Sequence, residues 1–327
     1  RTLNGTDPVS ALVTLQSLGA DVVGCNCSTG PEGMLGMIAA MKGHAVVPLA
    51  AKPNAGMPKL VGDATVFDLD AAGFAVFGEP LAAAGANLIG GCCGTTPAHI
   101  RALREATAAA KPNAPLRRTS AAVSSARNAV ILDRGRSLVV AGGGLNADEN
   151  ETVRQGLLDG DPGPVRQAVR AQEKEGAQIL LLKVGAEKVD ETGAVRQVLE
   201  QLAPTTRSAF LLAAGKVETV ERALRFYPGR MMVRVEGGET SANLLPVVAK
   251  YGTVPVLSAG TADRAAVRRA VAQARTHGFA TREIVVDCTP PALNPEAVRS
   301  MLGMIAWCSK VLGCPTLIDV CGVGKGL

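Results

Sequence analysis

The stretch Gln178-Ile179-Leu180-Leu181-Leu182-Lys183-Val184 decides the fold class, because it is a short apolar run that ends at Gly185. Runs of this kind are typical of β-strands bounded by turn residues. Amphipathic stretches lie on both sides of it, at Asp161 to Glu175 and at Thr192 to Leu202, and their apolar spacing indicates helices. This alternation of strand and helix predicts a parallel α/β fold.

The same alternation extends along most of the chain. Strands are predicted in the first part at Asp21 to Gly24, Ala45 to Leu49 and Ala86 to Gly90, with helices at Pro31 to Met41 and Phe74 to Ala84. Seven strands are predicted later, at Ser137 to Ala141, Gln178 to Val184, Ala209 to Ala213, Met231 to Val235, Val254 to Ser258, Ile284 to Asp287 and Thr316 to Val320. Seven strands with intervening helices fit most of a (β/α)8 barrel, although a doubly wound sheet gives a similar pattern.

A change of composition divides the chain into two parts. Residues 108–128 are rich in Ala, Ser, Pro and Arg and show no apolar period, so we interpret them as a linker. The expected domains are therefore residues 1–107 and 129–327. Because the chain begins at Arg1 and ends at Leu327 without closing either set of strands, we expect the first barrel to be truncated at its N-terminus and the second at its C-terminus.

The composition argues against several classes of function. The 327 residues are 47% hydrophobic and carry a net charge of +5 without a basic block, and only nine are aromatic. We therefore predict a globular protein that binds neither nucleic acid nor a membrane. Gly, Pro or a charge interrupts every apolar run before it could span a bilayer, and no signal peptide opens the chain, so we expect a cytoplasmic protein.

Three of the eight cysteines follow predicted strands. Cys27 comes just after the strand at Asp21 to Gly24, and Cys92 and Cys93 come just after the strand at Ala86 to Gly90. In a barrel these positions carry the chemistry. Three thiolates with one open position form a catalytic zinc site suited to a thiol substrate, because zinc lowers the pKa of a thiol that binds to it.

The other interpretation is that these cysteines are small packed hydrophobes. The glycines around Cys92 and Cys93 favour the metal, because Gly90, Gly91 and Gly94 let the backbone bring two neighbouring side chains to one ion. Spacing alone leaves both interpretations open.

A family resemblance favours the metal. It rests on three segments in order, which are Asn26-Cys27-Ser28-Thr29-Gly30-Pro31-Glu32-Gly33, Lys52-Pro53-Asn54-Ala55-Gly56-Met57-Pro58 and Gly90-Gly91-Cys92-Cys93-Gly94-Thr95-Thr96-Pro97-Ala98-His99-Ile100. These resemble motifs of the homocysteine S-methyltransferase family over residues 1–107, and the separation of 65 positions from Cys27 to Cys92 (92 − 27) suits that family. The resemblance implies a zinc-binding (β/α)8 barrel with Cys27, Cys92 and Cys93 as ligands and the sulfur of homocysteine as the fourth.

The resemblance has limits. The Asp-Gly-rich first strand of the family, which holds the amino-acid end of homocysteine, has no counterpart after Arg1. Cys25 has no counterpart in the motif and is interpreted as a packed thiol. The three histidines, at positions 44, 99 and 277, are interpreted as surface or helix-cap residues.

Residues 137–327 resemble, in pattern, the pterin-binding barrel that follows the homocysteine barrel in cobalamin-dependent methionine synthases. Most polar strand ends of that family are replaced here, by Lys183 and its neighbours, by Ala213-Ala214-Gly215, by Met231 or its neighbour and by Gly322. Asn146 and Asp287 are the candidate pterin contacts that remain. Because two contacts are few, binding of methyltetrahydrofolate is not the favoured prediction.

Two other motifs carry no predicted function. Gly142-Gly143-Gly144 lacks the residues of a phosphate loop and is predicted to be a tight turn between a strand and a helix. The cysteines of the second part, at positions 288, 308, 314 and 321, are predicted to be buried thiols.

Three functions remain open. The first is a zinc-dependent methyltransferase that forms methionine from homocysteine, with methylcobalamin arriving on another segment or on a cobalamin-binding protein. The second is a methyltransferase for a different thiol and a corrinoid protein. The third is a non-catalytic fragment whose second barrel is a degenerate scaffold that docks partner domains.

Overall fold

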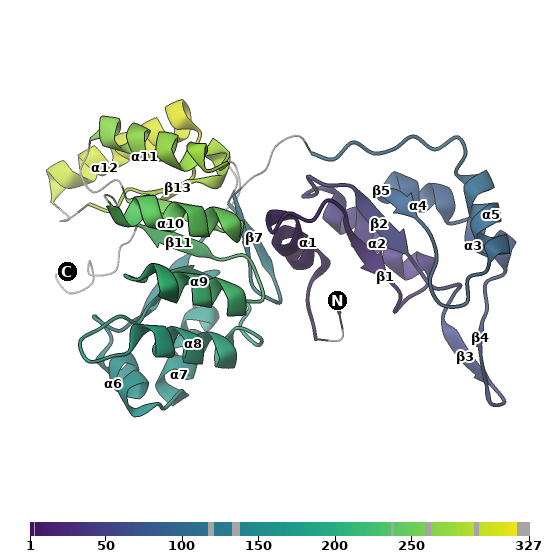
Figure 1. Ribbon diagram of the computed structural model, residues 1–327, viewed down its shortest axis with the longest axis horizontal. Coiled ribbons are helices and arrows are strands. Elements are labelled where there is room, and N and C mark those ends of the chain that lie inside the picture. Colours follow the sequence, from purple (N-terminus) through teal and green to yellow (C-terminus); the bar gives the residue numbers. More distant parts are fainter. Residues whose placement is uncertain are drawn as a thin grey trace. The chain divides into compact units, whose positions relative to one another are not determined.

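The computed structural model describes residues 1–2, 4–116, 121–132, 138–236, 239–258, 263–290 and 294–318, with the side chains of 239–241 excepted. The chain forms two compact units, Arg1–Arg118 and Thr119–Leu327 (Figure 1).

The first unit is built on a three-stranded parallel sheet in the order β1-β2-β5. Its strands are β1 (Val23–Asn26), β2 (Leu49–Lys52), β3 (Pro58–Val61), β4 (Ala64–Phe67) and β5 (Ala86–Ile89). Its helices are α1 (Pro8–Ser17), α2 (Pro31–Lys42), α3 (Ala71–Ala75), α4 (Gly78–Ala84) and α5 (Pro97–Ala106). The strands β3 and β4 pair as an antiparallel hairpin that projects from the rest of the unit (Figure 1).

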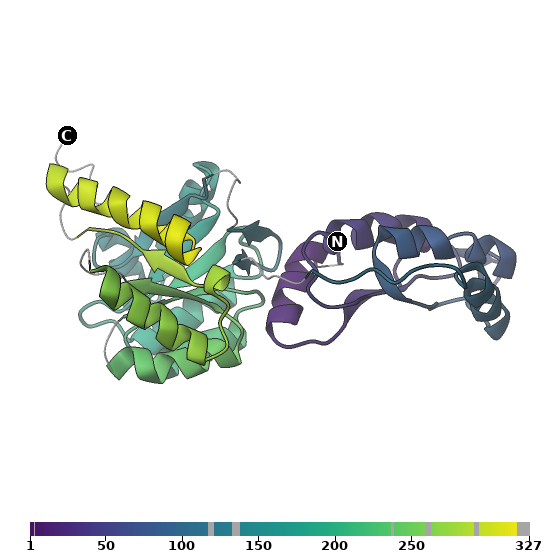
Figure 2. The same ribbon diagram turned by 90° about the horizontal axis from the view of Figure 1, so that it is seen from above.

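The second unit is built on a seven-stranded sheet in which every neighbouring pair is parallel. The sheet runs in sequence order through β8 (Ala141–Asn146), β9 (Ile179–Lys183), β10 (Ala209–Leu212), β11 (Met232–Val235), β12 (Val254–Ser258), β13 (Val285–Asp287) and β14 (Thr316–Leu317). The helices are α6 (Glu151–Asp159), α7 (Gly163–Lys174), α8 (Glu191–Leu202), α9 (Val217–Phe226), α10 (Glu239–Lys250), α11 (Arg264–Thr276) and α12 (Pro295–Trp307), with short helical turns η1 (Thr281–Glu283) and η2 (Cys308–Leu312). Figures 1 and 2 show helices packed along the outer side of this sheet.

The predicted α/β class is therefore confirmed, and six of the seven strands predicted in the second part overlap the strands β9 to β14. The strand predicted at Ser137 to Ala141 was placed too early, because the strand lies at Ala141–Asn146. A pair of (β/α)8 barrels is not confirmed. Among the described residues β8 and β14 are edge strands that do not pair with each other, so the sheet is a curled half-barrel.

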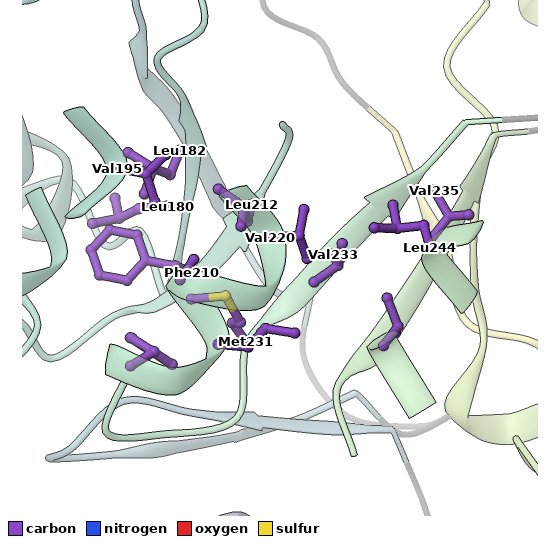
Figure 3. Packing of buried hydrophobic residues seen from close by; sticks show 14 of the residues in the cluster. Leu180, Leu182, Val195, Phe210, Leu212, Val220, Met231, Val233, Val235 and Leu244 are labelled. Atoms are coloured by element: carbon purple, nitrogen blue, oxygen red, sulfur yellow. The ribbon is translucent and has the colours of Figure 1, made fainter. Parts of the chain in front are cut away.

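The strands of the second unit are buried on both sides because their side chains alternate between two cores. On β9, Leu180 and Leu182 belong to the core beneath the helices, whereas Ile179 and Leu181 belong to the core inside the curled sheet. Figure 3 shows the first of these cores, in which Phe210 is fully buried among Leu180, Met231 and their neighbours.

The predicted linker over residues 108–128 differs from the structure near its end. Ala122–Ser124 forms the strand β6, which pairs with β7 (Ala129–Ile131), and Val123 is fully buried in the inner core. Tyr227 and Arg230 hold this hairpin, since the Tyr227 hydroxyl donates to the Ser124 carbonyl at 2.9 Å. Small Ala and Ser side chains carry little hydrophobic signal, which explains why the sequence pattern missed it.

The prediction of a turn at Gly142-Gly143-Gly144 is wrong, because these residues lie within β8. Gln172 of α7 occupies the space beside them, and its Oε1 accepts a hydrogen bond from the Gly144 amide at 2.8 Å. A Cβ at Gly142 would lie 2.2 Å from that oxygen. The glycines therefore serve a close approach between helix and strand.

Within the ranges given above, no helix is both long enough and apolar enough to cross a membrane.

Because Phe210 is fully buried in the core beneath the helices, we expect its removal to lower the free energy of unfolding strongly. Phe210→Ala is expected to destabilise the second unit by about 3–5 kcal/mol, because it removes a fully buried ring and leaves a cavity. Urea unfolding followed by the fluorescence of Trp307, the single tryptophan of the chain, measures this. The matched control is Phe226→Ala, whose ring is 48% exposed and should cost less than about 1 kcal/mol. Equal losses would contradict the packing.

Candidate metal centre

The three cysteines of the first unit converge where neighbouring parallel strands end. Cys27 follows β1, and Cys92 and Cys93 follow β5, with the end of β2 between them. The Cys27 and Cys93 sulfurs lie 3.6 Å apart, and the Cys92 and Cys93 sulfurs 3.9 Å apart. All three sulfurs lie within 4.8 Å of one another, so the structure brings together all three predicted metal ligands.

These distances fit a tetrahedral zinc site. Two thiolates bound at about 2.3 Å with a tetrahedral angle between them are about 3.8 Å apart. The two shorter separations observed, 3.6 and 3.9 Å, bracket that value. Three soft sulfur donors are also the set that zinc prefers, and three protein ligands leave a fourth position for a substrate.

The backbone at Cys27 is held in an unfavourable conformation. Cys27 and Ser28 have φ angles of 64° and 65°, in the left-handed region that side chains other than glycine rarely adopt. Each such residue costs on the order of 1–3 kcal/mol, which surrounding contacts must offset. One of these contacts is the hydrogen bond from the Cys27 amide to the Lys52 carbonyl, at 2.9 Å.

The loop after β2 fixes the other two cysteines. The Cys92 amide donates to the Pro53 carbonyl at 2.8 Å, and the Ala55 amide donates to the Cys93 carbonyl at 2.9 Å. The side chain of Asn54 accepts a hydrogen bond from the Cys93 amide through Oδ1, at 3.2 Å. One loop from the middle strand therefore positions both cysteine segments.

Asn54 is a functional residue that the sequence reasoning missed. It is buried, and besides the Cys93 amide its side chain hydrogen-bonds the sulfur of Cys27. The signal was present, because Asn54 lies in the quoted segment Lys52 to Pro58, but a role for it requires the fold that places β2 between β1 and β5.

The thiols of Cys27 and Cys93 differ in pKa. A hydrogen bond from the Ser28 amide, followed by hydrogen bonds from Cys93 and Cys92, lowers the pKa of Cys27 below its usual value. The same contacts act in the opposite direction at Cys93, where hydrogen bonds to Cys27 and Cys92 raise the pKa to about 11. Of these two cysteines, Cys27 therefore ionises first when no metal is bound.

The remaining candidate residues lie apart from this cluster. Cys25 packs against Met41, with 3.8 Å between their sulfurs. His99 caps α5 and contacts the Leu69 carbonyl at 3.0 Å, which confirms the helix-cap interpretation.

In the second unit, Cys288, Cys308 and Cys314 are buried as predicted, and Cys321 lies outside the described residues. Asn146 and Asp287, the candidate pterin contacts, lie at the ends of β8 and β13 in that unit.

Comparison with known proteins finds similarity to one family in the first part of the chain. Residues 1–107 match the model of the homocysteine S-methyltransferase family. Methionine synthase of Mycobacterium tuberculosis is 30% identical over 265 residues, which are 78% of this chain and 22% of that protein. Methionine synthase of Mycobacterium leprae is 28% identical over 71% of this chain and 20% of its own length. The chain thus spans about a fifth of the curated relatives it matches.

Among solved structures, dihydropteroate synthase of Xanthomonas albilineans with 4-aminobenzoic acid has 20% identity and a TM-score of 0.46, and the match covers 62% of this chain and 78% of that one. The dihydropteroate synthase of Yersinia pestis has 14% identity and a TM-score of 0.42, over 61% and 76% of the two chains.

The unequal pKa values predict an order of reaction. In chain freed of metal by a chelator, iodoacetamide at pH 8 should alkylate Cys27 faster than Cys93 by about tenfold or more, because the thiolate is the nucleophile. Reaction at Cys93 should continue to rise with pH until about 11, where its pKa lies. Mass spectrometry of tryptic peptides measures both rates, and equal rates at pH 8 would contradict the hydrogen-bond assignment.

Proposed function

We propose, from the match of residues 1–107 to the homocysteine S-methyltransferase family, that the cysteine cluster is the zinc site of a methyltransferase acting on a thiol. The convergence of three cysteine sulfurs within 4.8 Å carries the proposal. In it Cys27, Cys92 and Cys93 hold the ion, homocysteine is the acceptor, and methionine is the product.

The chain's own residues prepare this chemistry. Cys27, Cys92 and Cys93 bind as thiolates, and the Ser28 amide and Asn54 stabilise the first of them by hydrogen bonds. Zinc, when bound, lowers the pKa of the substrate thiol so that a thiolate is present near neutral pH. The three protein thiolates donate strongly, which keeps the substrate sulfur electron-rich and nucleophilic.

The methyl transfer follows from the nucleophilicity of the substrate sulfur. The substrate sulfur uses a lone pair to form the new bond to the methyl carbon, and the electron pair of the old carbon–donor bond leaves with the donor. With zinc bound, the substrate thiol would release its proton to solvent before this step, so the transfer itself would need no general base.

The methyl donor belongs to the same proposal. We infer methylcobalamin, presented by a cobalamin-binding domain or protein outside this chain, because the chain aligns with only 22% and 20% of the methionine synthases that match. Methyltetrahydrofolate is not part of the proposal. In this division of roles, residues 1–107 carry the homocysteine site, and residues 129–327 contain the curled parallel sheet.

Metal analysis tests the site. The purified chain should carry one zinc per molecule, and Cys27→Ser, Cys92→Ser and Cys93→Ser should each lose it, because two thiolates leave the ion incompletely coordinated. Cys25→Ser is the matched control, since its sulfur lies outside the cluster, and it should keep its zinc. Full zinc content in the Cys92 variant would exclude the proposed ligand set.

Asn54→Ala should weaken zinc binding without removing a ligand. Its side chain orients Cys93 and Cys27, and the loss of such an outer contact typically costs 10–100-fold in metal affinity, so we expect a decrease of about that size. Competition with a chromogenic chelator gives the affinity. Thr65→Ala on the exposed strand β4 is the control, and an unchanged affinity in both variants would show that Asn54 has no positioning role.

A further inference from the structure

One face of the three-stranded sheet in the first unit carries a lysine that the proposed function does not use. Side chains alternate along a strand, and Leu49 and Ala51 of β2 belong to the core of this unit. Lys52, the last residue of β2, therefore points to the opposite face, where its side chain is exposed. Asn26 ends β1 in register with Lys52, so it shares that face and is exposed as well.

Lys52 lies directly beside the cysteine cluster. Its carbonyl accepts the hydrogen bond from the Cys27 amide at 2.9 Å, and the carbonyl of the next residue, Pro53, accepts the bond from the Cys92 amide at 2.8 Å. Because β2 is the middle strand, the residue at its end has one cysteine segment on each side. Lys52 is therefore the cation that the fold places between the two segments of the metal centre.

The face on which Lys52 lies is open. A Cβ built on the neighbouring Gly90 would lie 3.7 Å from Cγ of Lys52, and apart from its chain neighbours it would meet no other described atom within 4 Å. Leu88, which precedes Gly90 by two positions and is paired in register with Ala50, is 51% exposed. The stem of Lys52 thus runs along unoccupied space that a small molecule can enter.

The charge of Lys52 is also free. Among the residues that the structure describes, none forms a hydrogen bond or an ion pair with the Lys52 ammonium or with the side-chain amide of Asn26. Lys59, the next lysine along the chain, is by contrast paired with Asp68 at 2.8 Å. An unpaired ammonium beside an unpaired amide NH2 group offers the donors that a carboxylate accepts.

We propose that Lys52 binds the α-carboxylate of the acceptor thiol, with the amide NH2 group of Asn26 as a second donor. The inference rests on the proposed function, and it specifies the acceptor as a thiol that carries a carboxylate. In homocysteine a short carbon chain separates the sulfur from the carboxylate, and the flexible four-carbon stem of Lys52 can adjust to that length. Attachment at both the metal and the ammonium distinguishes such a thiol from one without a carboxylate.

Titration calorimetry of the zinc-loaded full chain tests the proposal with two thiols, homocysteine and 3-aminopropane-1-thiol, which lacks only the carboxylate. The ratio of their two affinities is compared between variants, so that the intrinsic difference between the thiols cancels. Lys52→Met should lower the preference for homocysteine by about fivefold, as expected at the upper end for an exposed ion pair, and leave the affinity for 3-aminopropane-1-thiol unchanged. Lys52→Arg keeps the charge and should keep the preference.

Lys111→Met is the matched control, because it removes an exposed lysine of the same unit at the other end of the sheet. Lys111 lies close in sequence to Asn113, whose carbonyl accepts a hydrogen bond from Asn87 near the start of β5. This variant should bind both thiols like the parent chain. Zinc analysis of every variant shows whether the metal centre is intact.

The outcomes separate this inference from the proposed function. If Lys52→Met weakens the binding of both thiols equally, Lys52 acts on the metal centre and not on the carboxylate. If the ratio of affinities does not change, Lys52 makes no contact with the carboxylate. Either result overturns the inference and leaves the zinc site in place. Failure of both thiols to bind the zinc-loaded parent chain would overturn the proposed function, and this inference with it.

Discussion

Parallel pairing of β1, β2 and β5 is the constraint on which the metal centre depends, because it places the carboxyl ends of three strands at one edge of a sheet. Cysteines 65 positions apart in the sequence (92 − 27) meet only there. The loop after β2 then fixes their relative positions through backbone hydrogen bonds to Cys27, Cys92 and Cys93. The left-handed conformations of Cys27 and Ser28 persist because this loop holds them.

The second unit also depends on parallel strand pairing, in a sheet of seven strands. Its parallel strands are buried on both sides, so every second side chain points into the curled sheet. The apolar residues inside the sheet pack against the β6–β7 hairpin, whereas the carboxyl ends of the strands carry Lys183, Arg234 and Asp287. A position at the end of a strand can therefore change its ligand chemistry through one side chain, without altering the layers below.

Much of this architecture could be predicted from the sequence, and the failures have identifiable causes. Apolar runs such as Gln178 to Val184 predicted strands because a doubly buried strand is recognisable locally. Cys27, Cys92 and Cys93 were predicted because their segments match a family. The hairpin at Ala122–Ser124 and the strand through Gly142–Gly144 were missed because small residues give a weak hydrophobic signal, and their environment comes from distant residues such as Arg230 and Gln172. The contact of Asn54 with Cys93 and the ion pair of Arg234 with Asp287 join different strands, which spacing does not encode.

The central claim is that three cysteines hold a zinc ion whose fourth position accepts a thiol. X-ray absorption at the zinc K-edge, on the zinc-loaded chain with and without homocysteine, tests it most directly. The account predicts three sulfur scatterers at about 2.3 Å in the free protein and four when homocysteine is added. An unchanged number of sulfur scatterers on addition of homocysteine, or fewer than three without it, would contradict the account.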